Sequence, residues 1–309
     1  MFRIGVCAFA GIGAICAATL VKTVTLSRDF SGEPNTRFEN GRLLARGGDH
    51  RTVRTFDAKG NPEAEFALSL PDATSVSHKS VASFPDGGLA IAATASSREG
   101  AVLSVIVFTD GRGAIERIVR TTPFTVFHLA AGPDGSLWAV GREHDAKLDE
   151  VPDYDILRQY DRQGQFLRST LRKSSFHLQR GKWHPAYESW LSASRGRVAL
   201  YCVTAGELVE GSSSGEVIGR WGISGIPADA QATGLALTST GAIYVSTQVR
   251  SAQQTPVYRL ERGSGQFVQT RAVDLAPNHR GMSNIAGGDG DQVVFYAKWP
   301  TSLIWSRPE

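Results

Sequence analysis

Two stretches decide the fold: residues 127–140 read FHLAAGPDGSLWAV, and residues 156–167 read ILRQYDRQGQFL. In each, apolar residues lie on both sides of a short polar segment that contains Gly135 or Gly164. Glycine adopts the positive φ of tight hairpin turns without steric cost, so each stretch predicts two antiparallel strands joined by a turn. Two such hairpins in succession make a unit of four strands.

The same turns recur along the whole chain. A glycine opens an apolar strand at Gly41, Gly87, Gly135, Gly196, Gly241 and Gly290. The intervals between these glycines are 46, 48, 61, 45 and 49 residues. A second turn glycine follows in the first five units, at Gly60, Gly111, Gly164, Gly215 and Gly265. A four-stranded unit cannot bury both faces alone, so this repetition indicates sheets that stack on one another.

Radial stacking of such sheets gives a β-propeller. We therefore predict an all-β, six-bladed β-propeller of four-stranded antiparallel blades that occupies residues 22–309 as one domain. The last unit has strands at 292–298 and 302–306 after its turn, and no fourth strand follows. Residues 23–26 alternate Thr-Val-Thr-Leu, and we predict that this N-terminal strand completes the last blade and covers its edge.

Composition sets limits on the class of protein. The 309 residues are 41% hydrophobic and 20% charged, which is typical of a globular chain with a substantial core. A formal net charge of +3 does not indicate nucleic-acid binding through bulk charge. Three cysteines cannot form a disulfide scaffold, and Cys202 lies in an alternating run that predicts a buried strand thiol rather than a nucleophile.

Residues 1–21 are typical of a secretory signal peptide. Arg3 precedes an uncharged stretch at 4–21, and small residues allow cleavage after Ala18. The alternative is an uncleaved anchor, because these residues as a helix would reach about 27 Å, close to the hydrocarbon core of about 30 Å. Both interpretations place the rest of the chain outside the cytoplasm, either secreted or periplasmic, or tethered to a membrane through residues 4–21.

The two quoted stretches resemble repeats of the six-bladed propeller superfamily that includes NHL-repeat proteins and gluconolactonase/regucalcin-like hydrolases. The resemblance covers about residues 34–307. The gluconolactonase-like group implies a divalent metal in the central channel, held by a Glu and by Asn and Asp residues at the start of inner strands. Glu33 stands near the place of that Glu, whereas His128 and Thr233 stand where the group has Asn or Asp. Threonine is a poor ligand for such ions, so we expect no cofactor and keep a divalent metal as the alternative.

Two long insertions fall on one face of the predicted ring. Residues 143–155 contain six Asp and Glu residues against Lys147, and residues 171–188 are rich in Arg, Lys and His. Loops longer than a fold requires are often functional. The alternative is that the acidic and basic loops pair with each other and cover the edge of the ring.

The inner strands begin on the same face, so their first residues should line the mouth of the channel. The predicted ligand-binding residues there are His78, His128, Trp183, Glu188 and Asn284. Two imidazoles, a carboxylate and an amide can bind zinc, transfer protons or hold a polar ligand, and a tryptophan can stack on a sugar ring. The alternative is that the histidines are ordinary hydrogen-bonded residues and that the tryptophan packs between blades.

Catalytic motifs with a local signature are absent from the sequence, which has no Gly-x-Ser-x-Gly elbow, His-Glu-x-x-His pair or phosphate loop. The leading hypothesis is an exported monomeric propeller that binds a partner protein, peptide or glycan on the face with the insertions, and no nucleic acid. One alternative is a metal-dependent hydrolase or lyase, lactonase-like, with its site at the channel mouth. The other is a structural module tethered to a membrane.

Overall fold

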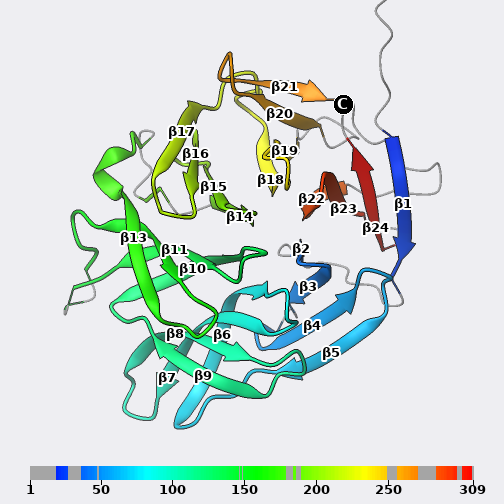
Figure 1. Ribbon diagram of the computed structural model, residues 1–309. Coiled ribbons are helices and arrows are strands. Elements are labelled where there is room, and N and C mark those ends of the chain that lie inside the picture. The colour runs from blue at the N-terminus through cyan, green and yellow to red at the C-terminus, as the bar shows by residue number, and fades with distance from the viewer. Residues whose placement is uncertain are drawn as a thin grey trace, which may run out of the picture.

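The predicted propeller is confirmed. In the computed structural model, six four-stranded antiparallel sheets surround a central axis, and the sheets follow one another in chain order around the ring (Figure 1). The structure describes residues 19–26, 36–46, 49–145, 147, 149–178, 184–185, 189–248, 256–270, 283–297 and 301–307.

Each of the first five blades is built from four consecutive strands, with its first strand next to the axis. Blade 1 contains β2 (Arg37–Glu39), β3 (Arg42–Arg46), β4 (Thr52–Asp57) and β5 (Pro62–Ala67). Blade 2 contains β6 (Ala73–Ser83), β7 (Leu89–Ser97), β8 (Val102–Thr109) and β9 (Ile115–Arg120). Blade 3 contains β10 (Phe124–Ala131), β11 (Leu137–Glu143), β12 (Asp155–Tyr160) and β13 (Phe166–Arg172).

The second half of the ring repeats this arrangement. Blade 4 contains β14 (Ser189–Ser194), β15 (Arg197–Cys202), β16 (Glu207–Ser212) and β17 (Val217–Gly222). Blade 5 contains β18 (Gln231–Leu237), β19 (Ile243–Gln248), β20 (Val257–Glu261) and β21 (Gln266–Thr270). Blade 6 contains β22 (Ser283–Asp289), β23 (Gln292–Ala297), β24 (Ser302–Arg307) and, outermost, β1 (Thr19–Thr25). A short 3₁₀ helix, Lys173–Ser175, follows β13.

The ring is closed by the N-terminal strand, as predicted. Strand β1 runs antiparallel to β24, with Thr23 opposite Ile304 and Thr25 opposite Ser302. It begins at Thr19, four residues before the predicted start. Leu26, directly after the strand, is buried, and its backbone N–H donates to the Thr301 carbonyl at 2.8 Å. Of the signal peptide predicted over residues 1–21, residues 1–18 lie outside the described residues and residues 19–21 belong to β1.

The hydrophobic core lies between neighbouring sheets. The second and third strands of the blades carry most of the fully buried side chains, including Trp138, Phe108 and Phe295. The outer strands, in contrast, alternate between exposed and half-buried residues, as in β5 and β17. This arrangement is what the physics of the repeat requires, because each sheet covers its apolar faces with the two sheets beside it.

The inner strands bend at β-bulges. A register shift falls between His78 and Ser80 in β6 and between Val126 and His128 in β10. Further shifts occur in β18 and β22, at Ala232/Gly234 and Ile285/Gly287. A bulge adds a residue to one strand and increases its local twist, which changes the direction of the side chains that follow. Simple alternation along these strands therefore does not tell which residues face the channel.

Inner strands of adjacent blades come close enough to exclude side chains. A Cβ on Gly287 in β22 would lie 2.0 Å from the Phe38 carbonyl oxygen in β2, and one on Gly234 in β18 would lie 2.2 Å from the Ile285 carbonyl oxygen. Both obstructing atoms belong to the backbone, which cannot rotate away as a flexible side chain can. Glycine at these positions therefore allows blades 5, 6 and 1 to meet at the axis.

The turn glycines mark the hairpins as predicted, with one correction. In blade 2 the turn between β8 and β9 contains Gly111, but the residue with positive φ is Gly113, at 94°. The cause is the turn geometry: Gly113 donates its N–H to the Asp110 carbonyl, and the Asp110 side chain accepts the N–H groups of Arg112 and Ala114. The hairpin lies where the repeat predicts it, but the glycine with positive φ comes two residues later than expected.

Two further features concern compartment and chemistry. Cys202 is buried in β15, and burial raises the pKa of its thiol far above the ordinary value, so it is a core residue as predicted. Within the described residues, no helix has the length and apolar character needed to cross a membrane.

Removing β1 should open the ring. A chain that starts at Ser27 would leave the edge of β24 unpaired and expose the surface that Leu26 covers. We expect a loss of at least about 3 kcal/mol in the free energy of unfolding, together with self-association through the free edge. Urea denaturation and gel filtration measure both effects. A chain that starts at Thr19 is the control, and equal stability of the two chains would contradict the closure.

Gly287→Ala should be strongly destabilising. The added methyl group meets the Phe38 carbonyl oxygen, so the inner strands of blades 6 and 1 would have to separate. We expect a loss of about 3 kcal/mol, the upper part of the range for overpacking. The matched control is Gly222→Ala in β17, where the Cβ meets no atom within 4 Å. Thermal denaturation of both variants measures the difference, and equal melting temperatures would refute the close approach.

Candidate functional site

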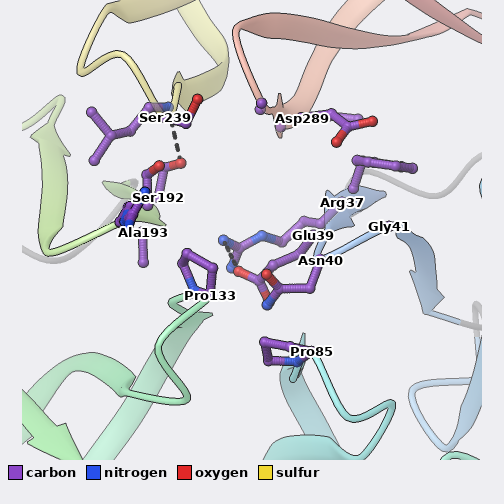
Figure 2. Close-up of a pocket in the computed structure, with 18 of the residues that line it drawn as sticks. Arg37, Glu39, Asn40, Gly41, Pro85, Pro133, Ser192, Ala193, Ser239 and Asp289 are labelled. Atoms are coloured by element: carbon purple, nitrogen blue, oxygen red, sulfur yellow. Dashed lines mark hydrogen bonds and ion pairs between the residues drawn. The ribbon is translucent and has the colours of Figure 1, made fainter.

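A cavity of about 480 Å³ lies in the central channel, at the mouth formed by the turns between the first and second strands of the blades. Figure 2 shows Arg37 and Glu39 in the middle of this mouth, between Pro133 of blade 3 and Asp289 of blade 6. The wall consists of backbone and small side chains from the ends of the inner strands. All six blades contribute to the lining, so the cavity exists only when the ring is closed.

Arg37 crosses the channel from blade 1. Its guanidinium donates to the Leu129 carbonyl of blade 3, and its Nη2 donates to the Leu191 carbonyl of blade 4 at 2.7 Å. The side chain is 18% exposed. Strand β2 has only three residues. The long Arg37 side chain spans the distance from this short strand to the backbone carbonyls of blades 3 and 4. The guanidinium forms the floor of the cavity and joins three blades.

Glu39 joins the same strand to blades 2 and 3. One carboxylate oxygen accepts the Ser83 N–H at 2.9 Å, and the other accepts the Ala131 N–H at 3.0 Å. The carboxylate is 3.5 Å from the Arg37 guanidinium. Burial raises the pKa of Glu39 to about 7, against the opposing effects of Arg37 and the two N–H groups. The charge of this carboxylate therefore changes near neutral pH.

The remainder of the cavity is apolar in the wall and polar at the rim. Leu235, Leu237, Ala193, Ala286, Pro85 and Pro133 supply the apolar surface. Ser194, Arg195 and Ser239 stand at the rim, and Arg195 and Ser239 are exposed. A deep cationic group beneath apolar walls suits a small molecule with one polar end and one apolar end.

At the opposite face, the two long insertions contact each other. Lys173 Nζ is 2.5 Å from Glu150 Oε1, and the Ser174 N–H donates to Asp153 at 3.0 Å. Arg172 pairs with Asp155 at 3.4 Å. The acidic and basic loops therefore pair with each other, which was the alternative interpretation of the sequence. The insertions lie between β11 and β12 and between β13 and β14, as predicted.

A buried histidine links the two insertions at their base. His184 has no exposed surface, and its Nε2 is 2.5 Å from Tyr154 Oη, which donates to Glu150 at 3.0 Å. Burial lowers the pKa of His184 to about 4, although Glu150 acts in the opposite direction. The neutral imidazole therefore donates its Nε2–H to the phenol oxygen. Burial also raises the pKa of Tyr154, so the phenol keeps its proton.

Three of the five residues predicted to bind a ligand, His78, His128 and Asn284, do not line the cavity. His78 is fully buried in β6, with Nε2 3.1 Å from the Thr52 carbonyl oxygen, and His128 is half-buried in β10. Asn284 is half-buried near the start of β22, and its Oδ1 is buried without a hydrogen-bond partner among the described residues. Trp183 and Glu188 lie outside the described residues. Binding by this set stays a prediction.

The described members of the donor set do not fit the divalent metal that the family resemblance implies. Thr233 donates its hydroxyl to Ser246 Oγ at 3.0 Å. Over the described part of the chain, no three His, Cys, Asp or Glu side chains come together in a way that could hold a metal ion. Glu33 and Glu188 lie outside that part.

Sequence reasoning missed Arg37, Glu39 and His184. The signal for the first two was the run Thr-Arg-Phe-Glu-Asn before Gly41, in which two charged residues occupy an inner strand. Inner strands of a propeller are crowded by neighbouring blades, so an alternating pair of opposite charges there indicates a polar contact across the channel. His184 had no comparable signal, because its burial depends on contacts between distant loops.

Comparisons with known proteins support the fold. No model of a known protein family matches the chain, and no curated protein matches it. A solved protein from Bacteroides fragilis that is described as exported aligns with 97% of this chain and 98% of its own, at 12% identity and a TM-score of 0.60. U3-55K aligns over 92% and 98% at 10% identity and a TM-score of 0.51. A luciferin-regenerating enzyme aligns over 94% and 95% at 11% identity and a TM-score of 0.50. At these identities the likeness concerns the fold alone.

Glu39 and His184 should contribute opposite pH dependences to the free energy of unfolding between about pH 4 and 7. The pKa of Glu39 is about 7 in the fold and 4.5 ordinarily, so stability is full below about pH 4.5 and falls as the pH rises to 7. The pKa of His184 is about 4 in the fold and 6.5 ordinarily, so stability is full above about pH 6.5 and falls as the pH drops to 4. Each change corresponds to about 3 kcal/mol.

Single variants should reveal the two slopes. Between pH 4.5 and 7 we expect the melting temperature of Glu39→Gln to rise with pH and that of His184→Gln to fall, relative to the unmodified protein. The slope is the readout, because Glu39→Gln also leaves one backbone N–H without its carboxylate acceptor at every pH. Glu216→Gln, which changes an exposed carboxylate, is the control. Variants that keep the parental slope would refute the assigned environments.

Proposed function

We propose that the protein is a binding propeller that holds a macromolecular partner on the face with the insertions, here called the insertion platform (143–155 and 171–178, with His184). The observation that carries the proposal is the set of contacts that fix the two insertions to each other. Lys173 and Glu150 form the outer contact, and Tyr154 and His184 form the buried one.

Fixed loops reduce the entropy lost when a partner binds. A propeller blade needs a short turn between its second and third strands, yet blade 3 has the whole segment between Glu143 and Asp155 at this position. The platform is ordered by polar contacts that contribute little to stability when exposed. Loops of this length, held in one arrangement, are not needed for the blade to fold. Recognition of a partner explains them better.

The exposed side chains of the platform favour a basic protein or peptide among the protein, peptide and glycan partners that the sequence suggests. Three carboxylates are exposed, those of Asp145, Asp149 and Asp153, against two exposed cations, Lys147 and Arg172. Lys173 is largely covered by its contact with Glu150. Complementary charge increases the rate of association and selects among partners. Rings for stacking on a glycan were expected at Trp183, which is outside the described residues.

We further propose that the protein acts outside the cytoplasm. The signal-like residues 1–21 support this location, as does the likeness to a protein described as exported. Strand β1 starts at Thr19, the residue after the expected cleavage position, so cleavage there would leave the closing strand intact. The tethered and metal-dependent alternatives have no comparable support among the described contacts.

Peptide binding tests the proposal directly. A peptide array with basic, neutral and acidic sequences of equal length, together with a glycan array, would be probed with the chain starting at Thr19. We expect selective binding of basic peptides, weakened about tenfold by Asp149→Lys through charge reversal. Lys173→Met should also weaken binding, because it removes the contact that fixes the platform.

The matched control is Glu216→Lys, the same charge reversal in a turn on the opposite face. It should leave peptide binding unchanged. Equal loss in both variants would mean a general charge effect and would contradict a site on the platform. Turnover on a panel of lactones after addition of divalent metal, lost in His128→Ala, would support the hydrolase alternative instead.

A further inference from the structure

The cavity at the other end of the channel is not explained by a platform for a macromolecular partner. It lies on the opposite face, and its lining includes no residue of the insertions. We propose that this cavity is a second, independent binding site for a small organic molecule that carries an oxyanion, a carboxylate or a phosphate, on a compact apolar body.

The dimensions suit such a ligand. Small-molecule sites usually enclose about 300–1,000 Å³ and combine apolar walls with a few oriented polar groups. The cavity measures about 480 Å³ and has this composition, with Leu235 and Leu237 on one side and Pro85 and Pro133 on another. One aromatic ring with a charged substituent fits well within this volume, since a cavity of about 150 Å³ is enough to hold benzene.

Arg37 is the group that would meet the oxyanion. A guanidinium has five N–H donors in a planar fork that matches the oxygens of carboxylate and phosphate groups. Among the described residues, Arg37 contacts three acceptors, namely two backbone carbonyls and Glu39. It therefore keeps donors for a ligand. The backbone carbonyls fix the position of the guanidinium. They carry no formal charge, so they neutralise little of its positive charge.

Two carboxylates also line the cavity, and each is held by N–H donors of the protein. Glu39 accepts the backbone N–H groups of Ser83 and Ala131, and its carboxylate lies 3.5 Å from the Arg37 guanidinium. Asp289 accepts the Trp305 indole N–H at 2.8 Å, within blade 6. Arg195, in contrast, is exposed at the rim and supplies a second positive charge. The guanidinium groups of Arg37 and Arg195 are the charged groups of the lining that offer N–H donors, and such donors bind an anion rather than a cation.

Four probes of similar size would separate charge from shape. Benzoate and phenyl phosphate carry the proposed groups, benzyl alcohol is neutral, and benzylamine is cationic. We expect both anions to raise the melting temperature and to give a one-site titration by calorimetry, whereas benzyl alcohol and benzylamine bind at least about tenfold more weakly. Stronger binding of phenyl phosphate than of benzoate would identify the ligand as a phosphate ester, and the reverse order would identify a carboxylate.

Two variants place the binding in the cavity. Ser239→Phe puts a ring at the rim, in an exposed turn, and should abolish binding of both anions. Ser213→Phe makes the same change in an exposed turn of the same face outside the cavity and should leave binding unchanged. Arg195→Gln should weaken binding about threefold to tenfold, whereas Arg112→Gln, on a turn outside the cavity, should not.

Three results would overturn the proposal. These are the absence of binding by both anions at 10 mM, equal affinity for benzylamine, and full binding by a correctly folded Ser239→Phe variant. The melting temperature of each variant without ligand shows that it is folded. Asp149→Lys on the platform should leave benzoate and phenyl phosphate binding intact, so this test is independent of the proposed function.

Discussion

Pairing between β1 and β24 joins the two ends of the described chain in a single sheet. Each blade of this ring is stabilised by apolar contact with the blades on both sides, so a gap at any point would expose two sheet faces and an unpaired edge. The chain reaches its final blade one strand short, and the N-terminal segment supplies that strand. The channel, the cavity and the relative positions of the insertions all require this closure, because each is formed by residues from several blades.

Closure also brings the inner strands together at the axis, which creates a problem of polar satisfaction. Backbone groups at the ends of β6, β10 and β14 face the narrow channel, where burial without hydrogen bonds is costly. Arg37 and Glu39 solve it from one short strand, since the first donates to carbonyls and the second accepts from N–H groups. The burial that makes these contacts possible also raises the pKa of Glu39 toward neutrality.

The fold could be predicted because its signals are local and repeated. The turn glycines gave the number of blades, and the alternation at 23–26 gave the closing strand, since each depends on a few neighbouring residues. The site depends on relations that no local pattern contains. Bulges in the inner strands change side-chain direction, and His78, next to one of them, is fully buried. His184 is buried through contacts with Tyr154 and Glu150, which belong to another loop.

The difference between the two faces explains why the cavity is where it is. On one face, blade 3 and its connection to blade 4 carry long insertions, which pack on each other and add surface outside the ring. On the other face the connections are tight hairpins closed by glycine, and hairpins of this kind are too short to fold over the axis. The channel therefore remains accessible at the face to which the sequence analysis assigned no site. The long loops indicate where a macromolecular partner can be held. The short turns on the opposite face leave the cavity open to a small molecule.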